Sequence, residues 1–394
     1  MPVHDITPAR RRRILVAGAG IAGAEVAMTL AIGLRDADVT LVGRWPSVRV
    51  LPDLVYVPFG VSPRRIDVPI ESLLPHGVGS VEAAVESVDA NAHQLHTSAG
   101  TLEYDVLVVA PGAQPPAGDH RSLRTLDDAV RIRHQLDRLV RAARSGDRSS
   151  IKILATSEHS WTAPACEFTL LLGAWLRSQR LDHLIETNFV TSDRHAFEWF
   201  GPIGETVVER AMRRARVQVT TDVPAGRLEA LEGDLVVEFG SLEPRTVPGL
   251  PGRSPNGWYD TTPGFRVADD VFVIGDALNL PYRAGFAAAW QSRRVLQELD
   301  GDLGRLGPDI DGVPIDAVEY QMDLADGVLR ARIDTASSLA RPFIGHDAQI
   351  EVIDGSRPDK LRGLLFHDRV LRYETTTYDA ALAYRDVLGG AAAS

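Results

Sequence analysis

The sequence predicts an α/β fold with two parallel-sheet units and a mixed α+β region at its C-terminal end. Strand and helix patterns alternate from the N-terminus onward, and a second strand–helix cycle begins at residue 151. A late buried strand, residues 271–274, is again followed by a helical pattern, residues 285–299. Such alternation favours parallel strands, because each intervening helix provides the crossover that a parallel pair requires.

The first cycle contains a glycine-rich turn between a strand and a helix. The apolar run 14–17 leads into the motif Gly18-x-Gly20-x-x-Gly23, and residues 24–31 repeat small apolar residues at helical spacing. Gly18 permits a tight turn, Gly20 lets a diphosphate approach the backbone, and Gly23 lets the helix pack closely on the strand. The amide groups and the dipole at the helix start favour an anion. We therefore expect the first unit to be a Rossmann-like dinucleotide-binding domain.

The residue after the second strand departs from the usual ribose-binding pattern. Residues 38–42 form this strand, and Gly43-Arg44 follows where an acidic residue would bind the adenosine ribose. An arginine at this place could face the 2′-phosphate of NADPH, stack on the adenine or point to solvent. This position alone therefore leaves both FAD and NADPH open as ligands.

A second marker lies far along the chain, where the apolar strand 271–274 ends in Gly275-Asp276. The glycine-rich turn, the buried strand 104–110 followed by Pro111-Gly112, and Gly275-Asp276 occur in the order seen in FAD-dependent pyridine nucleotide–disulfide oxidoreductases. The chain resembles most the branch of this family that contains sulfide:quinone oxidoreductases and type II NADH dehydrogenases. The resemblance covers roughly residues 12–300 and implies FAD as the cofactor.

The resemblance also implies where the cofactor would be held. The glycine-rich turn would bind the FAD diphosphate, Gly43 and Arg44 would lie at the adenosine, and Asp276 would hydrogen-bond the ribityl chain. Residues 50–60 would pass near the isoalloxazine. The full set of expected cofactor contacts is Gly18, Gly20, Ile21, Ala22, Gly23, Gly43, Arg44, Ala84, Val85, Ala110, Gly112, Gly275, Asp276 and Gly285.

The second unit departs from the family at its own strand-to-helix turn. Residues 155–161 read Ala-Thr-Ser-Glu-His-Ser-Trp and contain no glycine. Side chains at every position keep a diphosphate away from the backbone, and Glu158 would repel it. We therefore do not expect NAD(P)H to bind tightly in this unit.

The sequence contains one cysteine, Cys166, within a predicted helix of residues 164–180. Sulfide oxidation in the resembling branch uses a pair of cysteines, so that reaction is not expected here. Cys166 is interpreted either as a core residue or as a thiolate stabilised at the helix start. Its neighbour Glu167 is a candidate proton donor near the flavin. No other catalytic residue is identified, and no metal site is expected.

Composition limits the partners and the location. The formal net charge of −11 and the pI near 5.5 argue against nucleic acid, whose phosphates require a basic face. No uncharged apolar stretch approaches the ~18 residues of a membrane span, and a single cysteine fits a reducing compartment. We expect a cytoplasmic protein, and a homo-oligomer is compatible with the sequence.

We predict an FAD-binding domain from residues 1–115 and 247–300, a second NAD-like but degenerate domain from residues 116–246, and a C-terminal region, 301–394, that could serve as an interface. The favoured function is an FAD-dependent oxidoreductase that passes electrons between the flavin and a small-molecule or quinone-like substrate, or a partner protein. Two alternatives stay open: an NAD(P)H-dependent reductase with the same fold, and a degenerate flavin-binding or cofactor-free partner subunit.

Overall fold

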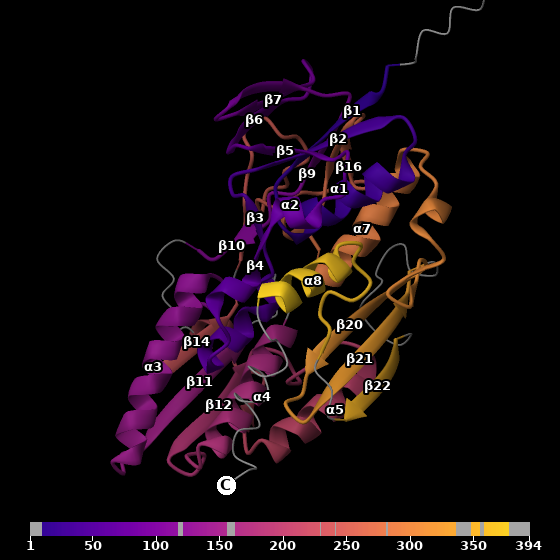
Figure 1. Ribbon diagram of the computed structural model, residues 1–394. Coiled ribbons are helices and arrows are strands. Elements are labelled where there is room, and N and C mark those ends of the chain that lie inside the picture. The colour runs from indigo at the N-terminus through magenta and orange to yellow at the C-terminus, as the bar shows by residue number, and fades with distance from the viewer. Residues whose placement is uncertain are drawn as a thin grey trace, which may run out of the picture.

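The computed structural model describes residues 10–116, 121–155, 162–228, 230–240, 242–280, 283–335, 348–354 and 358–377. Within these ranges, the side chains of residues 64, 65, 225 and 373–377 are not described. Two parallel sheets occupy opposite ends of the molecule, and a separate antiparallel sheet lies beside them (Figure 1). The predicted α/β fold class is confirmed.

The first sheet is parallel except at one edge, where β16 pairs antiparallel with β17. Its strands alternate with helices as expected, and the centre of β1 is buried because Ile14 and Val16 have no exposed surface. From one edge to the other the strands are β16 (Arg266–Ala268), β17 (Val271–Val273), β9 (Val106–Val109), β1 (Arg12–Ala17), β2 (Ala37–Gly43) and β5 (Gly79–Glu82).

Helices α1 (Ile21–Gly33) and α7 (Gly285–Glu298) lie side by side on one face of this sheet (Figure 1). They approach closely at Gly33, where an added Cβ would collide with the side chain of Leu296. An antiparallel meander of β6 (Val85–Asp89), β7 (Gln94–Thr97) and β8 (Gly100–Glu103) lies on the side away from α1.

The chain changes sheet between β5 and β6. Ala83 still donates its amide to the carbonyl of Gly43, beside the parallel sheet. Ala84 instead donates its amide to the hydroxyl of Ser98, and its carbonyl accepts from the amide of Ser98, in the meander.

The second sheet is also parallel, in the order β13-β12-β11-β14, and lies between α3 (Leu126–Arg144) and α4 (Ala163–Ser178). Helix α5 (Gly201–Arg214) begins directly after Phe200, which has a left-handed backbone with φ of 63°. The strands are β11 (Ser149–Ala155), β12 (Ile185–Thr191), β13 (Gln218–Thr220) and β14 (Leu235–Phe239).

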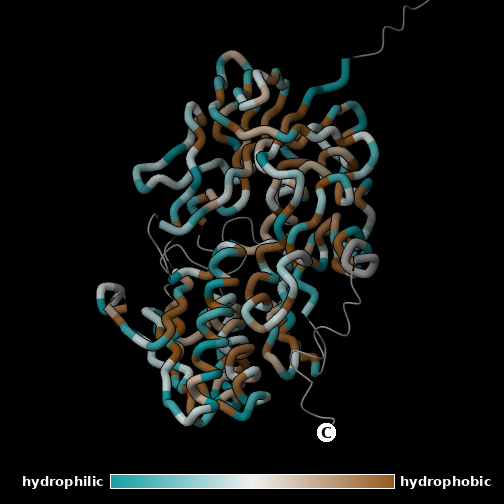
Figure 2. Tube along the Cα trace, turned by 60° about the vertical axis from the view of Figure 1, so that its left-hand side comes forward, coloured by the Kyte–Doolittle hydropathy of each residue, from teal (hydrophilic) through white to brown (hydrophobic). Residues whose placement is uncertain are grey.

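The antiparallel sheet of β20 (Ala317–Asp323), β21 (Gly327–Asp334) and β22 (Gln349–Asp354) belongs to the mixed C-terminal region and precedes helix α8 (His367–Thr377). Hydrophobic segments run through the interior of both ends of the molecule, with hydrophilic ones at the edges (Figure 2). The 3-10 helix η1 (Leu51–Phe59) extends from the first sheet and packs against α3 and α4. The ring centroids of Phe59 on η1 and Phe168 on α4 are 5.3 Å apart.

Candidate functional site

The glycine-rich turn closes against its own helix and against the end of β9. Gly18 has φ of +120°, and a Cβ there would collide with the carbonyl of Ala110. A Cβ on Gly23 would collide with the carbonyl of Gly18. Only glycine is therefore compatible with this turn at these two positions.

Gly20 differs from both of these glycines because it faces open space. Gly20 is exposed, no heavy atom lies within 4 Å of a Cβ placed on it, and Ile21 and Ala22 are partly exposed. No side chain of a described residue caps the helix at Gly20, and its first turn contains no acidic residue. The positive end of α1 is therefore presented to the surface, which suits an anion.

Three of the other predicted cofactor glycines lie against this turn and helix start, each from a separate segment. A Cβ on Gly275 would lie 3.2 Å from the Cβ of Ala22, and one on Gly285 would lie 3.9 Å from Cγ2 of Ile21. Gly43 packs so tightly on Ala19 that a side chain would not fit. The structure thus brings together the carboxyl ends of β1, β2 and β17, where ligands of open α/β sheets bind.

The backbone of Ala84, an expected adenine contact, already forms hydrogen bonds within the protein. The amide of Ala84 donates to the hydroxyl of Ser98 and is therefore not free for the adenine contact implied for Ala84, whereas its carbonyl accepts one hydrogen bond, from the Ser98 amide, and can accept another. Gly112, in contrast, has φ of +76° and open space at its Cβ position. These roles in cofactor binding stay predictions.

Asp276 is surrounded by arginines that the sequence did not indicate. Arg124 Nη2 donates to Asp276 Oδ2 at 2.8 Å, and Arg283 Nε donates to the backbone carbonyl of Asp276 at 3.1 Å. The Arg283 guanidinium lies 3.8 Å from the ring centroid of Trp258. Burial lowers the pKa of Arg283 to about 10, so it stays charged at neutral pH. The site is therefore positive overall, which fits the diphosphate of FAD.

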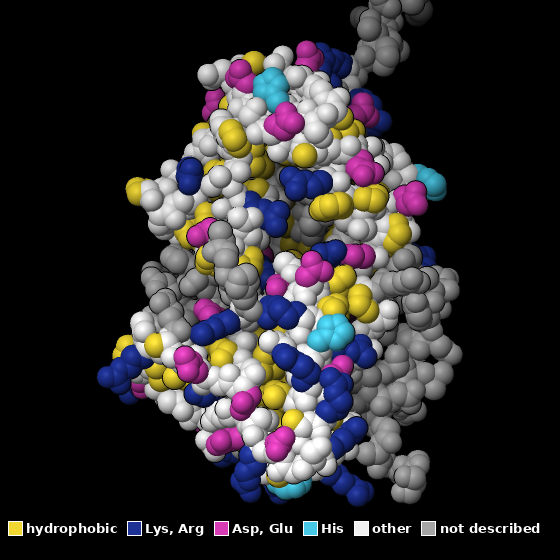
Figure 3. All heavy atoms as spheres, turned by 90° about the vertical axis from the view of Figure 1, so that its left-hand side faces the viewer, with side chains coloured by type: hydrophobic (Ala, Val, Ile, Leu, Met, Phe, Trp, Pro, Cys, Tyr) yellow, Lys and Arg dark blue, Asp and Glu magenta, His cyan; other side chains and the backbone are white. Residues whose placement is uncertain are grey.

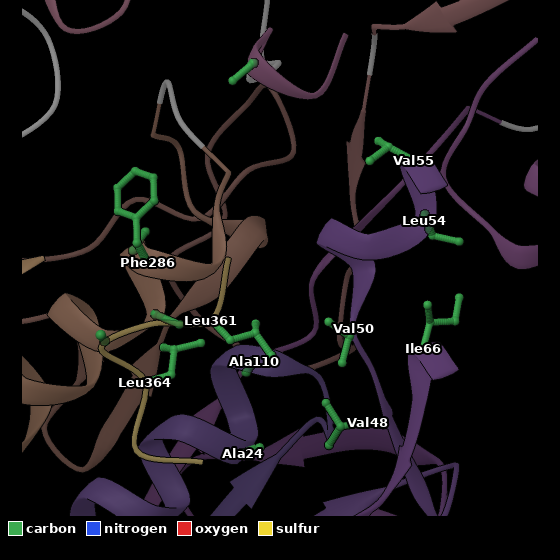
Figure 4. Close-up of a cluster of buried hydrophobic side chains, with 14 of the residues drawn as sticks. Ala24, Val48, Val50, Leu54, Val55, Ile66, Ala110, Phe286, Leu361 and Leu364 are labelled. Carbon is green, nitrogen blue, oxygen red and sulfur yellow. The ribbon is translucent and has the colours of Figure 1, made fainter. Parts of the chain in front are cut away.

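A buried apolar cluster adjoins the site (Figure 4). It unites residues from α1, the segment around η1, the end of β9, the start of α7 and the C-terminal segment. Each labelled residue is at most 8 % exposed. The labelled members are Ala24, Val48, Val50, Leu54, Val55, Ile66, Ala110, Phe286, Leu361 and Leu364.

A buried group of polar side chains joins η1, α4, β20 and the C-terminal segment. Glu167 Oε2 accepts from Lys360 Nζ at 2.8 Å, and Glu167 Oε1 accepts from the amide of Asp323 at 2.9 Å. The hydroxyl of Tyr56 donates to Asp323 Oδ2 at 3.1 Å and lies 3.3 Å from Glu167 Oε1. Lys360 also donates to the carbonyl of Pro52, within η1, at 2.6 Å. We call Glu167, Lys360, Tyr56 and Asp323 the acid–base cluster.

Two charge effects oppose each other at Glu167. Burial and the nearby Asp323 raise its pKa, whereas Lys360 lowers it, and the result is about 7. A carboxyl group with this pKa can take up and release a proton near neutral pH. Of the acid–base cluster, sequence reasoning identified only Glu167, because its partners are distant in the chain.

Cys166 is part of the protein core. Its side chain has no exposed surface, and its Sγ donates to the carbonyl of Ala196 at 3.2 Å. Burial, with Asp193 adding a smaller effect, raises the pKa of the thiol far above its ordinary value. The thiolate considered for the helix start is therefore disfavoured, and desolvation outweighs any stabilisation by the helix dipole.

Comparisons with known proteins agree with this geometry. Residues 12–148 match the family described as pyridine nucleotide-disulphide oxidoreductase. The sulfide:quinone oxidoreductase of Aquifex aeolicus is 17% identical with a TM-score of 0.69, covering 97% of this chain and 93% of that one. No functionally curated protein matches the sequence.

Two further structures share the fold over smaller parts. The ferredoxin reductase from Rhodopseudomonas palustris is 19% identical with a TM-score of 0.59, covering 83% of both chains. The NDH2 of Plasmodium falciparum, solved with NADH, is 15% identical with a TM-score of 0.53, covering 72% of this chain and 67% of that one. The predicted resemblance to this family is thus confirmed over residues 12–148, where it supports an FAD-dependent oxidoreductase, and nearly the whole chain shares the fold of these structures.

Proposed function

We propose that this protein passes electrons between FAD and a small-molecule or quinone-like substrate. The observation that carries the proposal is the open, positive helix start at Gly20, faced by Gly275 and Asp276. FAD, when bound, would supply the redox chemistry through its isoalloxazine ring. Gly20, Ile21 and Ala22 would hold its diphosphate, and Asp276 would bind its ribityl chain.

The acid–base cluster gives the proposal a proton-transferring group. Reduction of a quinone-like acceptor consumes protons as well as electrons, so a buried acid that titrates near pH 7 suits it. Glu167 would hold this proton, Lys360 would tune its pKa, and Tyr56 and Asp323 would keep the carboxyl group in place. The contact between Lys360 and Pro52 supports this role, because η1 is the segment expected near the isoalloxazine.

The cysteine content of the chain limits which substrates the flavin can serve. With one cysteine, buried in the core, the chain offers no cysteine pair for sulfur transfer.

Residues 156–161, which complete the second turn without a glycine, lie outside the described residues, so weak binding of NAD(P)H there stays a prediction. None of the helices in the described ranges combines the length and apolar character needed to cross a bilayer. The domain limits, a cytoplasmic location and a homo-oligomer also stay predictions.

The visible spectrum of the purified protein tests the proposal. We expect flavin bands near ~450 nm that persist with NADH and NADPH, bleach with dithionite under anaerobic conditions, and return when a short-chain quinone is added. Bleaching by NADPH would instead favour the reductase alternative. A colourless protein that takes up no FAD would overturn the proposal in favour of a partner subunit.

A further inference from the structure

The acid–base cluster is closed to solvent. The molecule is hollowed between its two ends on the face shown in Figure 3, where Lys and Arg side chains lie at the rim. Glu167, Tyr56 and Asp323 nevertheless lie in the interior, since each is at most 3 % exposed. A proton that Glu167 gives to an acceptor is therefore not replaced directly from bulk water. It has to reach Glu167 through hydrogen-bonded groups inside the protein.

Glu167 has three hydrogen-bond partners among the described residues, and they differ in what they can do with a proton. The amide of Asp323 only donates a hydrogen bond, and Lys360 gives up a proton only by losing the charge that balances the buried carboxylate. A phenol hydroxyl, in contrast, donates and accepts at the same time. Tyr56, whose hydroxyl oxygen lies 3.3 Å from Glu167 Oε1, is therefore the partner through which a proton can pass.

The same hydroxyl connects Glu167 to a second buried carboxyl group. Tyr56 donates to Asp323 Oδ2 at 3.1 Å, and Asp323 Oδ1 accepts from the amide of Ala325 at 2.7 Å. Asp323 is the last residue of β20, and the turn after it reaches the surface, because Ala325 is partly exposed and Asp326 is exposed. Tyr56 thus lies between Glu167 and a carboxyl group at the base of a surface turn.

The charges of the cluster favour a proton on this pair of carboxyl groups. Glu167 and Asp323 repel each other when both are ionised, and Lys360 balances only one of them. Burial and the charge of Asp323 accordingly raise the pKa of Glu167, against the opposing effect of Lys360. A proton that leaves one carboxyl group is therefore readily accepted by the other.

We infer that Tyr56 and Asp323 form a proton relay that reloads Glu167 from the turn between β20 and β21. The hydroxyl proton of Tyr56 moves to the Glu167 carboxylate while the carboxyl proton of Asp323 moves to the Tyr56 oxygen. One O–H bond breaks and one forms at Tyr56, so the net change is the transfer of one proton from Asp323 to Glu167. Solvent then reprotonates Asp323 through a local opening of the turn. The inference rests on the proposed function and gives both residues a role beyond positioning.

The experiment measures how fast Glu167 takes up a proton from solvent in the full-length, FAD-loaded protein. A light-released acid lowers the pH from above to below the pKa of Glu167, which is about 7. Time-resolved infrared spectroscopy follows the carbonyl band of the protonated carboxyl group, which is assigned by its absence in Glu167→Gln. No substrate and no turnover enter this measurement.

The two relay variants each remove one group and keep its surroundings. Tyr56→Phe removes the hydroxyl but keeps the ring, which lies 4.2 Å from Lys360 Nζ. Asp323→Asn removes the acid but keeps an oxygen for the amide of Ala325. The matched control is Tyr104→Phe, because Tyr104 is also buried and its hydroxyl has no hydrogen-bond partner among the described residues.

We expect each relay variant to slow proton uptake at least about tenfold, a modest share of what a positioned proton donor contributes. The control should keep the rate of the unaltered protein. Because the two groups act in series, the double variant should be no slower than the slower single variant. Either single variant suffices as the test if the other does not fold.

Three results would overturn the relay: unchanged rates in the relay variants, equal slowing in the control, or losses that multiply in the double variant. Failure of the proposed function gives a different result. If a short-chain quinone does not reoxidise the reduced flavin of the unaltered protein, the proposed function fails, and the rate of proton uptake still decides the relay.

Discussion

Helices α1 and α4 occupy equivalent places, each after the first strand of its unit, yet only α1 begins at the surface. Gly20 is exposed at the start of α1, whereas Thr162 and Ala163 at the start of α4 are buried. Both helices carry a buried glutamate at their fifth residue, Glu25 in α1 and Glu167 in α4. The same scaffold therefore exposes the start of one helix and buries the first described residues of the other.

The C-terminal segment contacts both glutamates but in different ways. Lys360 forms an ion pair with Glu167 at 2.8 Å, whereas Glu25 Oε2 accepts only the backbone amide of Leu365, at 2.9 Å, from this segment. Burial raises the pKa of Glu25 to about 8 although Arg293 opposes it, compared with about 7 for Glu167. The comparison indicates that a close lysine makes the second glutamate the better proton exchanger at neutral pH.

The largest expected effect comes from breaking the ion pair of α4. Glu167→Gln is expected to cost about 3–5 kcal/mol of the free energy of unfolding, since it leaves Lys360 buried without a counter-charge. Lys360→Met should cost a similar amount above pH 7 and less below it, because Glu167 can then take up a proton. Urea denaturation of both variants and of the double variant measures this. Additive losses in the double variant would show that the two groups are not coupled.

Gly20→Val tests whether the start of α1 is a ligand site. Gly20 already has the extended backbone of a helix cap, with φ of −90°, so valine fits the fold there but occupies the space of the diphosphate. We expect FAD affinity to fall at least about a hundredfold, or ~2.7 kcal/mol, with unchanged melting of the flavin-free protein. Gly226→Val, at another open glycine, is the control. Full FAD retention in the Gly20 variant would show that the site lies elsewhere.

Glu25→Gln isolates the glutamate that has no lysine partner. The folded-state pKa of Glu25 is raised from 4.5 to about 8, so folding favours its protonated form. Its contribution to stability is therefore fully present below about pH 4.5 and is lost as the pH rises through 8. The variant should equal the unaltered protein at pH 4 and be more stable by a few kcal/mol at pH 9, measured by denaturation at each pH. Equal stability at pH 9 would contradict the raised pKa.

How far the sequence predicts this molecule depends on whether a feature is local. The turn at Gly18 to Gly23 and the strand before Gly275 were predicted because spacing within a few residues determines them. The pair of Lys360 with Glu167 spans 193 residues, and Arg124 with Asp276 spans 152. Contacts of this kind are set by tertiary packing, which one sequence does not reveal. Cys166 shows the same limit, because the sequence left a core residue and a thiolate at the helix start as alternatives, and tertiary packing decides between them.

The smallest expected effect concerns α3, which contacts η1 from the first unit and β14 of the second sheet. Thr125 caps this helix in a reciprocal capping box with Asp128, and Arg124 just before it holds Asp276. Thr125→Ala should cost about 1 kcal/mol of stability and weaken FAD binding by a smaller factor, because a frayed helix start holds Arg124 less firmly. Thr206→Ala, at an exposed helical position without a cap, is the control. A loss of stability with unaltered FAD affinity would show that the cofactor site does not depend on the order of α3.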